Sequence, residues 1–322
     1  MNCSCYNRFG DNMEVYDLRP RGYCHGVAKA LSMVKKASLD ESIPKPIYVL
    51  GLIVHNKKIT EAFKSLGVIS LDTPNKTRLE LLDLVDQGTV IMTAHGVSDG
   101  VKEKALSKGL NVIDATCKDV TKVHDAVKNH LKEGYEIVYI GHKNHPEPEG
   151  VLGISKEITF LTNKTDALNY QMRNPHHKLF VTNQTTLSRY DINVVLDVLR
   201  LKYPDLIFDD DICDATTLRQ KAVIDQPQVE LCIVVGDTLS SNSNKLQFVS
   251  EHERNIKSFR VEDISEINPE WFKGIKKISL TSGASTPTAV TNEILGFLRQ
   301  FNYEDKSTWD TTSKLTYLDI LG

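Results

Sequence analysis

The chain has 322 residues, of which 40% are hydrophobic and 25% charged, and its formal net charge is -3 with its ten histidines counted as neutral. These values are typical of a globular protein with enough apolar material for two or three domains. The nearly balanced charge gives no reason to expect a nucleic acid or an anionic membrane as a partner. The first dozen residues lack the apolar core of a signal peptide, and no apolar run approaches the ~18 residues that span a bilayer. We therefore expect a cytoplasmic protein.

Short apolar runs alternate with amphipathic segments along most of the chain. The apolar runs predict strands over residues 15–18, 47–50, 90–93, 112–114, 137–140, 179–182, 231–235 and 278–281. The amphipathic segments predict helices over residues 27–37, 58–65, 79–85, 101–108, 120–133, 191–202, 215–225, 245–252 and 289–301. This alternation predicts an α/β fold with small parallel sheets covered by helices on both faces. We expect residues 1–12 and 303–322 to be tails, the second mostly extended.

The six cysteines include no CxxC pair, which argues against a zinc ribbon or a thioredoxin-type site. Three of them recur at similar intervals, since 93 residues separate Cys24 from Cys117 and 96 separate Cys117 from Cys213. These intervals suggest three similar lobes, which we place at residues 13–116, 117–211 and 212–302. Each of the three cysteines falls between a predicted strand and a predicted helix, where N–H groups favour a thiolate.

Three thiolates at one centre would suit an iron–sulfur cluster with one iron left open for substrate. On spacing alone, three unrelated buried cysteines are the simpler interpretation, because free cysteine is among the most buried residue types. Cys232 lies inside an apolar run and is expected to belong to the core.

The segment from Gly141 to Gly150, GHKNHPEPEG, directly follows a predicted strand. Open α/β sheets bind their ligands beyond the carboxyl ends of the strands. Because its two prolines oppose a continuing helix or strand, we predict a stiff loop. Its side chains suit proton transfer, metal ligation or anion binding, and Glu147 is the candidate proton donor, with Glu149 as the alternative. A solvated Pro-rich surface loop would explain the same composition.

Polar motifs also follow the other predicted strands, among them TAHGVS, QTT, SSNSN and GAST. Hydroxyls, amides and N–H groups at helix starts bind phosphate oxygens, and histidines add charge-assisted bonds, although such runs are also ordinary caps and turns. No GxxxxGK[ST] or GxGxxG is present, which argues against an ordinary nucleotide site. The pattern predicts a site for a diphosphate-sized anion. The candidates are His55, His95 and His145 with the runs 240–244 and 283–286, and the triplet 184–186 could hold a substrate hydroxyl or relay a proton.

The ordered set of motifs resembles that of the 4-hydroxy-3-methylbut-2-enyl diphosphate reductases, the IspH/LytB family of the methylerythritol phosphate isoprenoid pathway. The motifs are PRGYCHGV, VHN, TAHGVS, DATC with TKVH, GHKNHPEPEG, QTT, DICDAT, SSNSN and TSGASTP. The resemblance extends from about residue 16 to residue 301. It implies three pseudo-threefold related α/β lobes around a central iron–sulfur site.

The resemblance also implies a role for each candidate residue. Cys24, Cys117 and Cys213 would hold one [4Fe-4S] cluster, Glu147 would deliver the proton, and Thr185 would orient the substrate hydroxyl. The diphosphate would be bound by His55, His95, His145, Ser240, Ser241, Asn242 and Ser285. The implied reaction is a two-electron reductive dehydroxylation of (E)-4-hydroxy-3-methylbut-2-enyl diphosphate to isopentenyl and dimethylallyl diphosphates. A ferredoxin or flavodoxin-type protein would supply the electrons.

Two features depart from the family pattern. Lys118 stands where family members commonly have proline, which puts the local backbone shape and the charge near the cluster in doubt. Residues 1–12, with Cys3 and Cys5, have no counterpart and are interpreted as an extension or a start-site artefact.

Three alternatives to this function remain open. An open-site cluster could catalyse a dehydration without net electron transfer. A zinc hydrolase could use His142, His145 and Glu147, although Pro146 is expected to break any helix there. A non-catalytic phospholigand-binding protein would need neither metal nor electrons.

Overall fold

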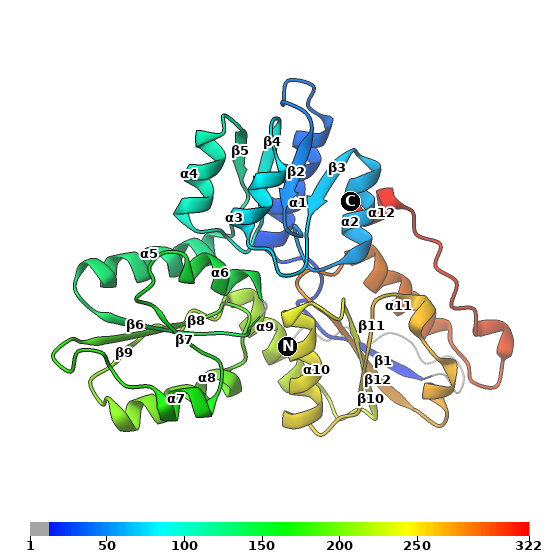
Figure 1. Ribbon diagram of the computed structural model, residues 1–322. Coiled ribbons are helices and arrows are strands. Elements are labelled where there is room, and N and C mark those ends of the chain that lie inside the picture. Colours follow the sequence, from blue (N-terminus) through cyan, green and yellow to red (C-terminus); the bar gives the residue numbers. More distant parts are fainter. Residues whose placement is uncertain (1–12, 144, 322) are drawn as a thin grey trace. The chain divides into compact units, whose positions relative to one another are not determined.

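The structure, a computed structural model, describes residues 13–143 and 145–321 (Figure 1). The prediction of a tail over residues 1–12, with Cys3 and Cys5, lies outside the described residues. The chain divides into two compact units, of which the first contains residues up to Val27, His55–Ser65 and the chain from Asp214 onward. The second unit contains Ala28–Val54 and Leu66–Cys213. Among the described residues, every helix is too short or too polar to cross a membrane.

The first sheet lies in the second unit and has four parallel strands in the order β3-β2-β4-β5. These strands are β2 (Ile47–Leu50), β3 (Val68–Leu71), β4 (Thr89–Met92) and β5 (Asn111–Asp114). The helices of this stretch of chain are α1 (His25–Leu39), α2 (Lys57–Ser65), α3 (Arg78–Leu81), the 3-10 turn η1 (Leu82–Leu84) and α4 (Asp99–Ser107). Leu50, Val90 and Met92 of the strands pack with Leu82 and Val101 of the helices to form the core.

The second sheet, also in the second unit, has the order β7-β6-β8-β9 and is again fully parallel. Its strands are β6 (Glu136–Ile140), β7 (Thr159–Leu161), β8 (Leu179–Asn183) and β9 (Ile207–Phe208). Its helices are α5 (Lys118–Lys132), α6 (Pro146–Leu152), α7 (Lys164–Asn169) and α8 (Arg189–Lys202). As Figure 1 shows, α5 and α6 cover one face of this sheet and α7 and α8 the other.

The continuous apolar run of β6 follows from this double cover. Val138 and Ile140 belong to the core beneath α8, whereas Ile137 and Tyr139 belong to the core beneath α5. Side chains alternate between the two faces of a strand, so a strand covered on both faces has to be apolar throughout. The pattern that predicted a buried parallel strand therefore has its expected cause.

The third sheet lies in the first unit and has the order β11-β10-β12-β1. Its strands are β1 (Glu14–Asp17), β10 (Leu231–Val235), β11 (Ser258–Val261) and β12 (Lys277–Ser282). Its helical segments are α9 (Asp214–Ile224), α10 (Ser241–Glu253), α11 (Thr288–Gln300), α12 (Tyr317–Leu321) and the 3-10 turns η2 (Ile264–Glu266), η3 (Pro269–Phe272) and η4 (Lys306–Thr308).

All three sheets share one strand order. In the first two sheets, the first strand in the chain lies between the second and the third, and the fourth lies beyond the third; β10, β11, β12 and β1 take these first to fourth positions in the third sheet. The third sheet takes its fourth strand, β1, from the beginning of the chain, where it pairs with β12. β1 thus occupies the position that β5 and β9 occupy in the other sheets, and the expected segment 13–116 contains one strand of the third sheet in addition to the whole first sheet.

The predictions of an α/β fold and of three small parallel sheets are confirmed, and eight predicted strands are present. The sequence reasoning missed β3, β7, β9 and β11, each of which is an edge strand of its sheet. Edge strands have one partner and partial cover, so their sequences carry a weaker apolar signal. β9, for example, has only two residues, and neither is fully buried.

The prediction of an extended tail over residues 303–322 is wrong in part. The segment forms η4 and then α12, which packs against α2 within the first unit. Ile320 is 4% exposed, its carbonyl accepts a hydrogen bond from the Tyr23 hydroxyl (3.1 Å), and Glu293 of α11 accepts bonds from Ser313 Oγ (2.9 Å) and the Lys314 N–H (2.7 Å). A segment without helical periodicity is thus fixed by tertiary contacts that local sequence does not encode.

Candidate functional site

The three candidate cysteines occupy the same position in the three sheets. Cys24 follows β1, Cys117 follows β5 and Cys213 follows β9, and each directly precedes a helix. All three are half-buried thiols, and the Cys24 sulfur accepts the Val27 N–H of α1 (3.4 Å). Each cysteine therefore lies beside the unpaired N–H groups of a helix start.

The backbone at each cysteine is held in the same way. The N–H groups of Cys24, Cys117 and Cys213 donate to the carbonyls of Ala284 (3.1 Å), Ala94 (3.0 Å) and Thr185 (3.0 Å), respectively. Each of these acceptors lies two residues beyond the third strand of its sheet. The similar intervals between the cysteines therefore reflect a repeated local structure. Cys232 lies in β10 and is fully buried, as expected for a core residue, and burial raises the pKa of its thiol.

Lys118 is the first residue of α5, and Cys117 is its N-cap. Proline is favoured at this position because its φ suits the first turn and its missing N–H would have no helical partner. Lys118 keeps the helix start in place, with the Thr121 N–H donating to the Cys117 carbonyl (3.0 Å), and its own side chain is exposed. The departure from the family pattern leaves the backbone around this cysteine regular.

The prediction of a stiff loop over residues 141–150 is wrong in its second half, where Pro146–Leu152 forms α6. Pro146 stands at the first helical position and Pro148 in the first turn, where proline breaks no helical hydrogen bond. His145 is the N-cap, and its Nδ1 accepts the Glu147 N–H (3.3 Å). The prolines therefore start this helix.

Glu147 is 1% exposed and sits in a set of hydrogen bonds within the second unit. Its carboxylate accepts from the Thr185 N–H (2.8 Å), the Thr185 hydroxyl (2.9 Å) and the Tyr139 hydroxyl (3.2 Å). Burial raises the pKa of Glu147 to about 7, against the lowering effect of these three donors. A carboxyl group with this pKa can hold a proton near neutral pH and release it.

Glu149, the alternative donor, is differently placed. It accepts the Arg78 N–H (2.7 Å) through one oxygen and forms an ion pair with the Arg78 guanidinium through the other. Glu149 is thus held by Arg78, whereas Glu147 is buried and has a raised pKa, so the surroundings favour Glu147 as the acid.

The zinc-hydrolase alternative finds no support in this segment. In the part of the chain that the structure describes, His142, His145 and Glu147 do not bring three ligand atoms within 4.8 Å of one another. The Glu147 carboxylate bonds to Thr185 and Tyr139, and His145 Nδ1 caps α6. Helix α6 forms here although Pro146 was expected to prevent a helix, but it does not bring these three side chains together as metal ligands.

Two candidate histidines lie together in the second unit. The rings of His95 and His145 meet edge to face, with 5.4 Å between their centroids. His95 follows β4 and its Nδ1 lies 3.4 Å from the Thr93 hydroxyl, while His145 follows β6. The ends of two strands from different sheets therefore bring these two imidazoles together.

The first unit brings His55, Ser240 and Ser285 together. The Ser240 and Ser285 hydroxyl oxygens lie 3.2 Å apart, and the Ser285 hydroxyl donates to the His55 carbonyl (3.4 Å). Ser240 is the N-cap of α10, where its oxygen accepts the Ser243 N–H, and Ser241 begins the helix. Hydroxyls and N–H groups thus converge at a helix start, which is chemistry suited to phosphate oxygens.

Asn242 is 4% exposed and links two site segments. Its Oδ1 accepts the Ala284 N–H (2.9 Å), and its Nδ2 donates to the Thr216 hydroxyl of α9 (3.2 Å). Its neighbour Ser243 packs so closely that a Cβ on Gly236 or on Gly283 would lie 2.0 Å from the Ser243 oxygen. These glycines let α10 approach the ends of β10 and β12.

Sequence reasoning missed two side chains that complete these sites. Tyr139 lies inside the apolar run of β6, so nothing in the pattern distinguishes its hydroxyl from the rest of the core. Asp237 lies in the β10–α10 loop, is 2% exposed, and accepts N–H groups from Leu239 (2.8 Å) and Lys57 (3.2 Å). Its proximity to SSNSN was the only available signal.

Comparison with known proteins places these features in a family. The model of the LytB protein family matches residues 15–299. The 4-hydroxy-3-methylbut-2-enyl diphosphate reductase of Bacillus cereus (strain B4264) is 48% identical over 310 residues, which cover 96% of this chain and 97% of that protein. The protein of the same name from Bacillus thuringiensis (strain Al Hakam) is similar to the same extent, 48% over 310 residues.

Solved structures give the same result. The E-1-hydroxy-2-methyl-but-2-enyl-4-diphosphate reductase of Plasmodium falciparum matches with a TM-score of 0.81 and 34% identity, over 88% of this chain and 87% of that chain. A second structure, an (E)-4-hydroxy-3-methyl-but-2-enyl diphosphate reductase described as the terminal enzyme of the non-mevalonate pathway, has a TM-score of 0.62, 32% identity, and covers 88% of this chain and 97% of that chain. The chain therefore belongs to the LytB protein family.

Proposed function

We propose that this protein is the 4-hydroxy-3-methylbut-2-enyl diphosphate reductase that its relatives are named for. The reaction is the two-electron reductive dehydroxylation of (E)-4-hydroxy-3-methylbut-2-enyl diphosphate to isopentenyl and dimethylallyl diphosphates. The observation that carries the proposal is the repeat of one half-buried cysteine, held by one backbone hydrogen bond before a helix, in each of three sheets of identical strand order.

Cys24, Cys117 and Cys213 would hold the [4Fe-4S] cluster. Their chemistry fits, because cysteine sulfurs are the usual ligands of iron–sulfur clusters, and all three lie half-buried directly before a helix. Three ligands leave one iron of a four-iron cluster open. When bound, the cluster supplies electrons one at a time and an open Lewis-acid position for the substrate oxygen.

Glu147 would supply the proton that leaves with the substrate oxygen as water. Burial raises its pKa to about 7, so that it can hold a proton near neutral pH, and its bonds to Thr185 fix the position of the carboxyl group. The Thr185 hydroxyl lies next to this carboxyl and would orient the substrate hydroxyl.

The residues that we propose to bind the diphosphate fall into two groups, each described within its own unit. His95 and His145 lie together in the second unit, and His55, Ser240, Ser241, Asn242 and Ser285 belong to the first. Imidazoles, hydroxyls and N–H groups supply the several hydrogen-bond donors that a diphosphate needs. A ferredoxin or flavodoxin-type protein would deliver the electrons, and we expect the enzyme to work in the cytoplasm.

The proposal is tested on anaerobically purified protein by its iron and sulfide content and its visible spectrum. We expect about four irons per chain in the wild-type protein and a large loss of iron and colour in Cys117→Ser. Cys232→Ala is the matched control, because Cys232 is a buried core thiol, and it should retain both.

Turnover separates the remaining alternatives. With a chemical reductant, the wild-type protein should convert the hydroxymethylbutenyl diphosphate with consumption of two electrons per product. Conversion without electron consumption would favour a dehydratase. Iron-free protein that still binds pyrophosphate after anaerobic reconstitution would instead identify a phospholigand-binding protein.

A further inference from the structure

The first turn of α2 has charges that oppose its own helix dipole. This helix, which the structure describes in full, begins with Lys57 and Lys58 and has no acidic residue in its first turn. Positive side chains at a helix N-terminus are unfavourable, because the unpaired N–H groups there already carry positive partial charge. These unfavourably placed charges begin two residues after His55, one of the residues proposed to bind the diphosphate.

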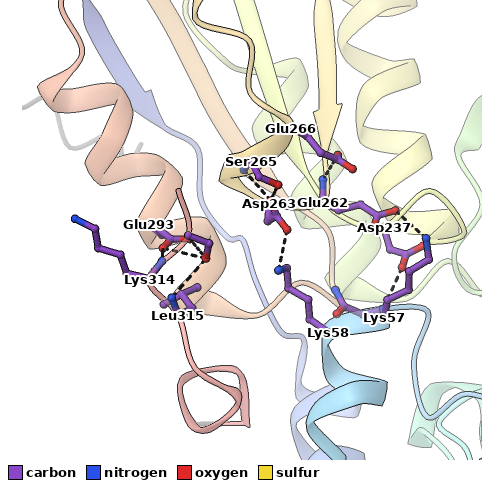
Figure 2. A network of polar contacts seen from close by, with 12 residues as sticks. Lys57, Lys58, Asp237, Glu262, Asp263, Ser265, Glu266, Glu293, Lys314 and Leu315 are labelled. Carbon is purple, nitrogen blue, oxygen red and sulfur yellow. Dashed lines mark hydrogen bonds and ion pairs between the residues drawn. The ribbon is translucent and has the colours of Figure 1, made fainter. Parts of the chain in front are cut away.

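Carboxylates from other elements of the first unit compensate this charge. Figure 2 shows Lys57 and Lys58 beside Asp237, Glu262 and Asp263. Lys58 Nζ lies 2.7 Å from an Asp263 oxygen, and Lys57 Nζ lies 3.9 Å from a Glu262 oxygen. The Lys57 side chain is 68% exposed, so its ion pair is weak, whereas Lys58 at 32% and Asp263 at 17% are better shielded.

Asp237 makes the most direct connection. One of its oxygens accepts the Lys57 N–H (3.2 Å) and the other accepts the Leu239 N–H (2.8 Å). The first donor lies two residues after His55, and the second lies one residue before Ser240. A single carboxylate, 2% exposed, thus joins the two backbone segments that carry these candidate ligands.

The surrounding carboxylates are themselves fixed. Asp263 accepts the Ser265 N–H (2.7 Å) as the N-cap of η2, and the Glu262 N–H donates to Glu266 (2.8 Å) (Figure 2). The Thr238 hydroxyl, beside Asp237, donates to Glu262 (3.4 Å). The end of β11 and the β10–α10 loop therefore carry one cluster of carboxylates, consisting of Asp237, Glu262 and Asp263.

We propose that Asp237 is a positioning residue for substrate binding, supported by Glu262 and Asp263. It fixes the start of α2, and with it His55, against the Ser240–Ser285 pair, so that groups from two separate chain segments fit one diphosphate. The inference rests on the proposed function, because it assumes that these residues bind the diphosphate.

Charge alone predicts the opposite result. A buried carboxylate near the binding site should repel a diphosphate, so removing it would strengthen binding if Asp237 had no positioning role. If Asp237 positions the ligands, removing it weakens binding. The sign of the effect therefore separates the two interpretations.

The experiment compares Asp237→Ala, Asp237→Asn and Asp263→Asn with wild-type holoenzyme. It measures the affinity for inorganic pyrophosphate, KM, kcat, iron content and thermal stability. We expect Asp237→Ala to weaken pyrophosphate binding and raise KM about 10-fold, with kcat within about 2-fold and iron content unchanged. Asp237→Asn retains one acceptor oxygen, so its affinity for pyrophosphate should fall about 3-fold. The affinity of Asp263→Asn should fall less. Asp263→Asn keeps the test meaningful if an Asp237 variant fails to fold.

Glu61→Gln is the matched control, because it makes the same change of charge at an exposed position of α2 and should leave KM unchanged. Unchanged or tighter pyrophosphate binding by folded Asp237→Ala overturns the positioning role, as does a loss confined to kcat. Wild-type protein that neither binds pyrophosphate nor turns over the substrate overturns the proposed function and this inference together.

Discussion

Glu147 in the second sheet and Asn242 in the third occupy equivalent positions with different chemistry. Each lies seven residues beyond the first strand of its sheet, in the first turn of the next helix. Each accepts the N–H of the residue two places beyond the third strand, which is Thr185 for Glu147 (2.8 Å) and Ala284 for Asn242 (2.9 Å). That residue's carbonyl, in both cases, accepts the N–H of a candidate cluster cysteine.

The difference lies in what each side chain can titrate. Glu147 is buried with donors from Thr185 and Tyr139, and its pKa rises to about 7. Asn242 is a neutral amide, and its second group donates to Thr216. The same backbone arrangement therefore carries a titratable carboxyl group near one cysteine and a neutral, hydrogen-bonded amide near another. The repeat gives geometry, and single side chains give each copy its chemistry.

The largest expected effect on turnover comes from replacing the Glu147 carboxyl group by a neutral amide like that of Asn242. Glu147→Gln keeps an acceptor for the Thr185 N–H but cannot release a proton at neutral pH. We expect turnover to fall by about 100- to 10,000-fold, with pyrophosphate affinity and iron content close to wild type. Glu149→Gln, which disturbs the ion pair with Arg78, is the comparison variant. A normal rate in Glu147→Gln would exclude Glu147 as the donor.

The raised pKa of Glu147 has a consequence for stability. The folded protein holds this proton more tightly than the unfolded chain, whose carboxyl has the ordinary value of 4.5. Below pH 4.5 this group does not change the free energy of unfolding. As the pH rises from 4.5 toward about 7, it lowers the free energy of unfolding, and the loss stays constant above that pH. This loss is about 3 kcal/mol. Denaturant unfolding from pH 5 to 8 should show the wild-type protein losing stability relative to Glu147→Gln, and a constant difference would contradict the shift.

The reverse exchange places a carboxylate in the third sheet. Asn242→Asp still accepts the Ala284 N–H, and the Thr216 hydroxyl can turn to donate to it. The added negative charge should weaken pyrophosphate binding about 10-fold if the diphosphate lies beside it. Asn244→Asp adds the same charge in the same helix, where Arg260 donates to residue 244, and is the control. Equal losses in both variants would mean that the effect is not local.

The smallest expected effect tests the tuning of Glu147. Tyr139→Phe removes one donor to the carboxylate and leaves a ring of the same shape in the core. Because that donor stabilises the charged form, its loss raises the pKa of Glu147 further. The alkaline limit of turnover should move upward by less than one pH unit, which corresponds to about a 2- to 3-fold higher rate near pH 8. A limit that moves downward would show that the hydroxyl does not act through Glu147.

How far the sequence could lead is clearest at particular elements. The strands β2 and β10 were predicted with their observed bounds, because both are covered on two faces and read as unbroken apolar runs. The edge strands β3, β7, β9 and β11 were missed for the converse reason. The cysteine intervals and the strand-end motifs indicated a repeat, but β1 closes the third sheet from the far end of the chain, and only pairing with β12 shows this.

The amino-acid sequence by itself determined the fold class, the family, many of the elements and the candidate side chains, because periodicity and motif spacing are local properties of the chain. Tertiary structure decided what those side chains do. It made a helix from a Pro-rich segment and packed α12 on α2. It buried Glu147 against Thr185, and it brought Asp237 to the start of α2 across 180 residues of sequence. Burial and contacts between distant segments set pKa values and positions, and no local pattern contains them.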